Sequence, residues 1–240
     1  MITYSLTNQG RVRSNNQDFY FSSDTPVGVL PNLYIVADGM GGHNAGEFAS
    51  HFGVESLLES VKVATSIDTE EVLLDATERA NGMLYAESVK DIAKAGCGTT
   101  MVEAVIENNK LVVLNIGDSR LYYITKDGIT QITRDHSVVE ELVRSGILTS
   151  DEARVHPDRH KITRAFGIEP QVEADVFERD VAPGGYIIMC TDGLSNMVTD
   201  EELFGIVMDK RDPKLIAEAA VSAANEAGGT DNITITVIAI

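Results

Sequence analysis

The sequence predicts an α+β protein in which helices flank sheets that are mainly antiparallel. Short β-branched and aromatic runs cluster around two tight turns in the middle of the chain, and longer segments with apolar residues at helical spacing lie on either side. The 240 residues are 43% hydrophobic, which is enough to bury a substantial core. We expect one domain that covers residues 1–240.

Strands are expected where short apolar runs end at turn residues. Asn108-Asn109 can close one hairpin and Asp127-Gly128 another, because these dipeptides tolerate the positive φ of tight hairpin turns. The predicted strands cover residues 2–6, 33–37, 101–107, 111–116, 120–125, 186–191 and 233–240.

Four longer segments are predicted to be helical. Residues 45–61 carry apolar side chains on one face, and Asp68 with Glu71 begins a second amphipathic helix that reaches position 84. Thr199 with Glu202 begins a third, and an alanine-rich helix lies between Asp212-Pro213 and Gly228. Residues 137–160 contain two short helical patterns separated by Gly146, and we interpret them either as a surface connection or as a substrate-facing flap.

Charge and cysteine content exclude several classes of protein. The formal net charge of −18, from 37 acidic and 19 basic residues, would repel nucleic acid and anionic membrane surfaces, so neither is an expected partner. Cys97 and Cys190 are far apart and form no CxxC pair, which argues against a disulfide framework or structural zinc. With no signal pattern or spanning apolar run, the expected location is the cytoplasm.

A repeated local pattern carries most of the functional information. Four aspartates adjoin predicted strand ends and are flanked by small residues: Asp38, Asp118, Asp192 and Asp231. A single Asp-Gly pair is most simply a turn, but four occurrences coupled to strands indicate carboxylates held at rigid edges. If the four gathered at one place, a close pair would repel by about 4 kcal/mol at 4 Å, so cations would be required.

Carboxylate and water ligands favour Mg²⁺ or Mn²⁺, whereas zinc would call for histidine or thiolate ligands. Two such ions a few ångströms apart can activate water for in-line displacement at phosphorus. A phosphate-binding arginine should then stand nearby, and Arg13, five residues before Asp18, is the leading candidate.

These segments together resemble the metal-dependent protein phosphatase family, protein phosphatase type 2C, in its bacterial form. The resemblance spans essentially the whole chain, and its motifs occur in the order of the family. They are RSNNQD (13–18), VADGMGGH (36–43), GCGTT (96–100), NIGDSR (115–120), TRDHS (133–137), CTDGLS (190–195) and GTDNIT (229–234).

The resemblance implies a four-layer α-β-β-α sandwich, with two antiparallel sheets face to face and a metal site at one end. It implies that Asp38 bridges two ions, that the Gly39 carbonyl binds the second ion, and that Asp192 and Asp231 complete the first. The remaining positions that it implies are Asp118 with Asp192 for a third ion, Asp18 for orienting metal-bound waters, Arg13 for the phosphate, and a flap at 137–160.

The chain departs from the family pattern at two positions. Met40 stands where many animal members carry a histidine proposed as general acid, so that role is unassigned; His43 is the nearest substitute, although it could equally contact substrate or flap, and a metal-bound water could donate the proton. Gln17 replaces a glutamate found in some members. His136 is expected to be a structural hydrogen-bonding residue.

The leading functional prediction is hydrolysis of phosphoserine and phosphothreonine in proteins by a monomeric enzyme, with a Ser/Thr protein kinase as counterpart. A catalytically silent binding module is one rival, and the presence of Asp38, Asp192 and Asp231 argues against it. A phosphatase for small phosphoesters is the other rival, and its reaction centre would be the same.

Overall fold

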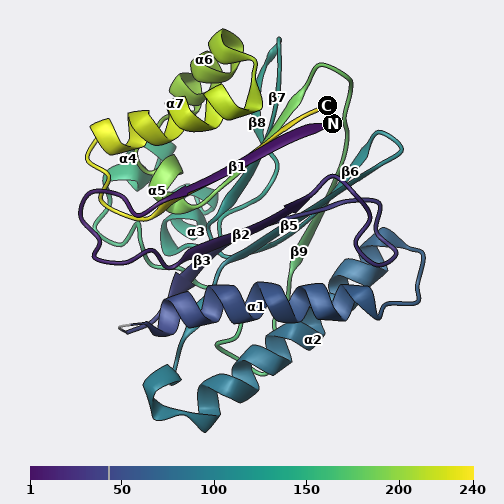
Figure 1. The fold of residues 1–240 in the computed structure, drawn as a ribbon. Coiled ribbons are helices and arrows are strands. Elements are labelled where there is room, and N and C mark those ends of the chain that lie inside the picture. The colour runs from purple at the N-terminus through teal and green to yellow at the C-terminus, as the bar shows by residue number, and fades with distance from the viewer. Residues whose placement is uncertain (43) are drawn as a thin grey trace.

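The computed structural model describes residues 1–42 and 44–240 and forms four layers, two of helices and two of sheet (Figure 1). Helices α1 and α2 cover one sheet, and α6 and α7 cover the other. This arrangement is the predicted four-layer sandwich. The helical segments are α1 (Ala45–Lys62), α2 (Thr69–Lys90), the short 3-10 helix η1 (Ile92–Lys94), α3 (Val138–Arg144), α4 (Ser150–Val155), α5 (Asp192–Ser195), α6 (Asp200–Lys210) and α7 (Pro213–Glu226).

The two sheets are antiparallel throughout their main pairings. Sheet 1 has the order β1 (Ile2–Asn8), β11 (Ile233–Ala239), β10 (Tyr186–Cys190), β7 (Arg120–Thr125), β8 (Gly128–Gln131). Sheet 2 has the order β2 (Asp18–Ser23), β3 (Leu33–Met40), β5 (Met101–Glu107), β6 (Lys110–Ile116), β9 (Asp175–Asp180), and the short β4 (Gly98–Thr99) pairs with the end of β3.

Local signals in the sequence set many of these boundaries. The Asp68 side chain accepts the Glu71 N–H at 3.0 Å at the start of α2, and Thr199 with Glu202 forms a full capping box on α6. Asn108 and Asn109 adopt φ of 51° and 64° in the β5–β6 turn, as that hairpin requires. The predicted helices and both hairpins are therefore confirmed.

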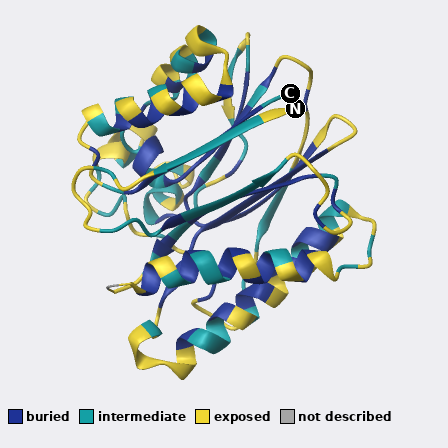
Figure 2. Ribbon diagram, in the orientation of Figure 1, coloured by how far each residue is buried: buried dark blue, intermediate teal, exposed yellow. Residues whose placement is uncertain are grey.

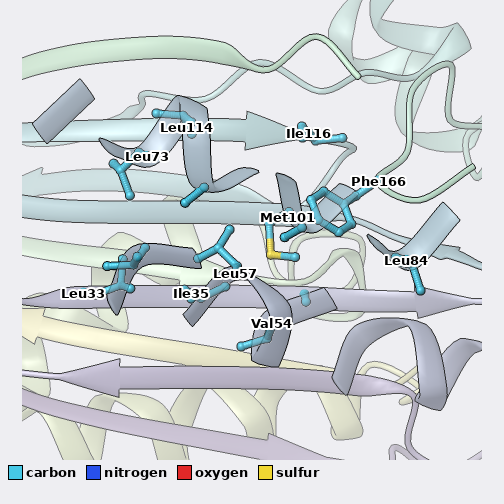
Figure 3. Packing of buried hydrophobic residues seen from close by; sticks show 14 of the residues in the cluster. Leu33, Ile35, Val54, Leu57, Leu73, Leu84, Met101, Leu114, Ile116 and Phe166 are labelled. Carbon is cyan, nitrogen blue, oxygen red and sulfur yellow. The ribbon is translucent and has the colours of Figure 1, made fainter. Parts of the chain in front are cut away.

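Three apolar clusters hold the layers together, and the buried strands lie between helices whose outer faces are exposed (Figure 2). The first cluster lies between α1, α2 and sheet 2, where Val54, Leu57 and Leu73 pack over Ile35 and Met101 (Figure 3). The second lies between sheet 1 and the α6–α7 layer, and the third between the two sheets. Alternate residues of each strand thus face different clusters.

The strand prediction was incomplete. Residues 18–23, 98–99, 128–131 and 175–180 form β2, β4, β8 and β9, which were not among the predicted strands, although the turn before β8 was predicted. The strand predicted at 33–37 continues to Met40. The free thiols of Cys97 and Cys190 are buried. Among residues 1–42 and 44–240, none of the helices combines the length and apolar content needed to cross a membrane.

Candidate metal centre

Strand directions bring the four predicted aspartates to one end of the sandwich. In sheet 2, β3 and β6 run the same way because each is antiparallel to β5, so Asp38 and Asp118 lie at the same edge. In sheet 1, β10 and β11 are antiparallel, so Asp192 just after β10 lies beside Asp231 just before β11. The convergence is a consequence of the topology.

Two glycines allow the backbone segments at this edge to approach closely. A Cβ at Gly39 would stand 2.0 Å from the Gly46 carbonyl oxygen, at the start of α1. A Cβ at Gly193 would stand 1.9 Å from the Asn232 carbonyl oxygen, which lies next to Asp231. Any side chain at either position would push these segments apart, since contacts of that length are sterically impossible.

Asp18 connects the two sheets. It pairs in register with Asp38 in sheet 2, and its Oδ2 accepts hydrogen bonds from Thr191 at 2.9 Å and from Thr234 at 2.7 Å in sheet 1. Its Oδ1 is buried and has no partner among the described residues. Burial raises the pKa of Asp18 to about 7, and the charges of Asp192 and Asp231 add to the rise while the two threonines oppose it.

Asp38 lies at the electrostatic centre of the cluster. Burial raises its pKa well above the ordinary value, and the charges of four neighbours raise it further: Asp18, Asp192, Asp118 and Asp231. The pKa of Asp118 is also well above its ordinary value, first through burial and then through Asp192. This mutual repulsion means that the five carboxylates lie close enough to act on one another.

The backbone of Asp38 is held by two threonines of the GCGTT segment. Its N–H donates to the Thr100 hydroxyl at 2.9 Å, and its carbonyl accepts the Thr99 hydroxyl at 2.9 Å. The Thr100 hydroxyl also lies 2.7 Å from that of Ser119, next to Asp118. These contacts fix the position of the central carboxylate relative to a second one.

Arg13 lies at the mouth of the cluster. Its guanidinium donates to Asp231 Oδ2 at 2.7 Å, and its side chain is 51% exposed. Burial alone would lower the pKa of Arg13, but the hydrogen bond to Asp231 and the charges of Asp231, Asp38 and Asp192 outweigh that effect and raise it. The predicted phosphate-binding cation therefore stands beside the predicted acidic centre.

The carboxylate oxygens suit hard divalent cations, although the side chains do not form a closed cage as they lie. Asp18 Oδ1 and Asp192 Oδ1 are buried without partners among the described residues, and buried polar atoms normally have one. Over residues 1–42 and 44–240, no three histidine, cysteine, aspartate or glutamate side chains are set to hold an ion. Arg13 and Asn196 donate hydrogen bonds to the Oδ2 atoms of Asp231 and Asp192, at 2.7 and 2.9 Å respectively.

His136 holds the turn that precedes Asp118. Its Nδ1 accepts the Gly117 N–H at 3.0 Å, and its own N–H donates to the Gly117 carbonyl at 2.9 Å. Burial, and then the charge of Arg164, lower the pKa of His136 despite Asp175 at 3.4 Å. The structural role expected for this histidine is confirmed.

The segment 137–160 stands next to the acidic centre. It contains α3 and α4, separated at Gly146 as expected, and lines a cavity of about 330 Å³ together with Asp118 and Asp192. His160 Nδ1 lies 4.0 Å from Asp192 Oδ2, although no sequence signal singled this histidine out. Met40 ends β3 and is half-buried, and the predicted His43 lies outside the described residues.

Sequence reasoning missed the hydroxyl and amide groups that organise the aspartates. Thr191, Thr234 and Thr100 received no role, and Asn232 Oδ1 accepts the Gln17 N–H at 2.9 Å across the seam between the sheets. Thr191 and Asn232 each adjoin a candidate ligand and Thr234 follows Asp231 by three residues, so their position close to an aspartate was the available signal. Thr100 lies in GCGTT, which carries no aspartate, and no local signal pointed to it.

The layers and the acidic edge together define a four-layer α-β-β-α sandwich with a centre suited to divalent cations. The protein phosphatase 2C family model matches residues 4–233, and the chain belongs to that family. It is 38% identical to the serine/threonine phosphatase stp of Listeria innocua, over 97% of this chain and 93% of that protein. It is 36% identical to protein phosphatase PhpP of Streptococcus pneumoniae, over 98% and 96% respectively.

Solved structures agree with this assignment. The PPM Ser-Thr phosphatase MsPP from Mycobacterium smegmatis superposes with a TM-score of 0.88 at 35% identity, covering 100% of this chain and 98% of that chain. Stp1 from Staphylococcus aureus superposes with a TM-score of 0.91 at 31% sequence identity, covering 99% of this chain and 94% of that chain. The catalytic domain of PstP, which was solved with two manganese ions, gives 0.87 at 30%, covering 98% and 96%.

Proposed function

We propose that this protein is a metal-dependent serine/threonine phosphatase that removes phosphate from phosphoserine and phosphothreonine in proteins. The observation that carries the proposal is the meeting of Asp38, Asp192 and Asp231 at one edge of the two sheets, with Arg13 beside them. A silent binding module would not need these carboxylates held at a repulsive distance. The PstP structure with two manganese ions supports Mn²⁺ or Mg²⁺ as the cofactor.

In this proposal Asp38, Asp192 and Asp231 would hold the first ion, and Asp38 with the Gly39 carbonyl would hold the second. When bound, the ions would lower the pKa of a water molecule and neutralise charge on the phosphoryl group. Asp18 is buried beside Asp38 with a free Oδ1, which suits it to accept a hydrogen bond from an ordered water. A third ion at Asp118 and Asp192 is supported by the closeness of these two carboxylates, since Asp192 is the neighbouring charge that most raises the pKa of Asp118.

Arg13 would bind the non-bridging phosphate oxygens. Its guanidinium is half-exposed and can rotate from Asp231 toward an incoming phosphate, and a planar guanidinium binds phosphate through two parallel hydrogen bonds. Release of Asp231 by Arg13 would also free an oxygen for an ion. We therefore expect metal binding and phosphate binding to favour the same rotation of this side chain.

The same proposal includes a flap, a partner kinase, the oligomeric state and the location of the protein. Residues 137–160 would act as a flap, because α3 and α4 line the cavity next to Asp118 and Asp192. A Ser/Thr protein kinase would supply the phosphorylated proteins, and the enzyme would act as a monomer formed by one domain. The two buried free thiols fit a reducing cytoplasm.

The decisive experiment is phosphate release from a phosphothreonine peptide, assayed with Mn²⁺ and with a chelator, for the natural protein and Asp38→Asn. We expect metal-dependent turnover that the substitution abolishes without unfolding the protein. Glucose 6-phosphate at the same concentration tests the rival hypothesis of a phosphatase for small phosphoesters, which requires faster turnover of the sugar phosphate than of the phosphopeptide. Turnover that persists in chelator would contradict the proposed centre.

A further inference from the structure

A groove separate from the acidic centre runs along the other side of Met40. It has a volume of about 1090 Å³ and lies between α2 and residues 162–174. None of the five aspartates of the centre lines it. Met40 ends β3 two residues after Asp38, so this end of the groove lies about 7 Å from Asp38 along the strand, at roughly 3.3 Å per strand residue.

The far end of the groove can be placed from the strand register. Thr77 of α2 lines the groove and donates to Glu103 Oε1 at 2.7 Å, and Glu103 lies opposite Ile35 of β3. Ile35 and Met40 are five residues apart on β3, so the groove spans roughly 16 Å along this strand, and Asp38 lies level with a point between its two ends. This length matches about five residues of extended peptide.

The walls of the groove are held in place by contacts with α2. Asn81 accepts the Gly167 N–H at 2.7 Å and donates to the Glu169 carbonyl at 3.0 Å. Phe166 is fully buried beneath this segment, and a Cβ at Gly167 would stand 2.3 Å from Leu84. The groove is therefore preformed, which lowers the entropic cost of binding a segment in it.

The lining combines partly exposed apolar side chains with exposed carboxylates, which we call the rim carboxylates. Leu74, Ile168 and Val172 are partly exposed apolar side chains of the walls. The rim carboxylates are Asp75, Glu78, Glu169 and Glu173, all exposed, and none forms an ion pair within the described part of the chain.

A single cation, Arg164, is among the lining residues, and it is already engaged. It donates to Asp175 Oδ1 at 2.8 Å and to the Glu173 carbonyl at 2.9 Å. Among the described lining residues the four rim carboxylates therefore have no compensating cation, and a cationic, partly apolar chain is the electrostatic complement of the groove.

From these observations we infer that the groove binds a basic segment of the phosphoprotein substrate, within about five residues of the phosphorylated residue. The inference rests on the proposed phosphatase function. The occupant would lie extended, with lysine or arginine side chains at the rim carboxylates and an apolar side chain against Leu74 or Val172. The groove would then select substrates without contacting the phosphate.

The test uses phosphothreonine peptides that carry two arginines at positions −5 and −3 or at +3 and +5, each with a matched peptide that has glutamine instead. We expect one arginine peptide to have a kcat/KM about three- to tenfold above its glutamine counterpart, mainly through KM, because two exposed ion pairs contribute on that scale. The preference should shrink in 0.5 M salt.

The double variant Glu78→Gln/Glu169→Gln should lose this preference and keep its turnover of p-nitrophenyl phosphate. Glu218→Gln/Glu226→Gln on α7 is the matched control, since it removes the same charge from the helix layer over the other sheet. Equal rates for arginine and glutamine peptides, or an equal effect of both double variants, would overturn the inference. Failure of every phosphopeptide to react would instead overturn the proposed function.

Discussion

Replacement of Asp38 by asparagine should stabilise the metal-free protein while it abolishes hydrolysis. Asp38 stands among four other carboxylates, and burial together with their charges raises its pKa well above the ordinary value. A pair of carboxylates 4 Å apart at an effective dielectric near 20 repels by about 4 kcal/mol. Asparagine keeps the shape and removes the charge, so we expect a gain of about 2–4 kcal/mol.

The measurement is thermal unfolding in chelator and in Mn²⁺. For a chain of this size, 1 kcal/mol shifts Tm by roughly 2–4 °C, so Asp38→Asn should melt about 5–15 °C above the natural protein in chelator. Ions at a concentration of 100 Kd should stabilise the natural protein by about 2.7 kcal/mol and the variant much less. The difference between the Tm of Asp38→Asn and that of the natural protein should therefore become smaller or change sign when Mn²⁺ is added.

The control is Asp127→Asn, which removes one carboxylate from the hairpin turn between β7 and β8, where asparagine before glycine is equally favourable. It should leave Tm within about 2 °C in both conditions. If Asp38→Asn melts below the natural protein in chelator, the Asp38 carboxylate is not destabilised by repulsion from its neighbours. An equal Mn²⁺ shift in the natural protein and the variant would remove Asp38 from the cation site.

Three further outcomes follow from the same structure. Arg13→Ala should raise KM for a phosphopeptide about tenfold or more, the scale of a charged hydrogen bond, and steady-state kinetics with an unchanged KM would exclude its phosphate role. If a third ion takes part, Asp118→Asn should lower turnover and change the dependence of activity on Mn²⁺ concentration. An unchanged dependence would show that a third ion is not needed for catalysis. Burial raises the pKa of Glu103 to about 8 from 4.5, so the folded state loses stability as pH rises through that window. In denaturant unfolding, the free energy of unfolding of Glu103→Gln should therefore rise relative to that of the natural protein between pH 5 and pH 8.5. A difference in unfolding free energy that stays constant over this range would contradict the raised pKa of Glu103.

Features encoded by neighbouring residues could be predicted from the sequence. The caps at Asp68 and Thr199 and the turn at Asn108-Asn109 each depend on side chains within four residues, and all three formed as predicted. The four strand-end aspartates were also visible as a local pattern. Their convergence depends on the topology of the sheets, which a local pattern cannot supply. The prediction that they converge therefore rested on the family resemblance.

Two of the strands that were not predicted, β9 and β2, show where local pattern fails. The β9 sequence, DVFERD, is largely charged because β9 is an edge strand that pairs only with β6 on the path through sheet 2. The β2 sequence, DFYFSS, begins with Asp18 and ends in serines, so it resembles a loop. Its strand conformation is imposed by pairing with β3, a contact between segments that the sequence does not mark.

The position of the acidic centre on the seam between the sheets has a consequence for stability. Asp18, Asp38 and Asp118 come from sheet 2, whereas Asp192 and Asp231 come from sheet 1, so their repulsion acts to separate the sheets at this edge. The hydroxyls of Thr191 and Thr234, which reach Asp18 from the opposite sheet, oppose that separation with two hydrogen bonds to a single oxygen. Cations shared by carboxylates of both sheets would convert the repulsion into a cross-link, so ion binding and sheet packing at this edge should be coupled.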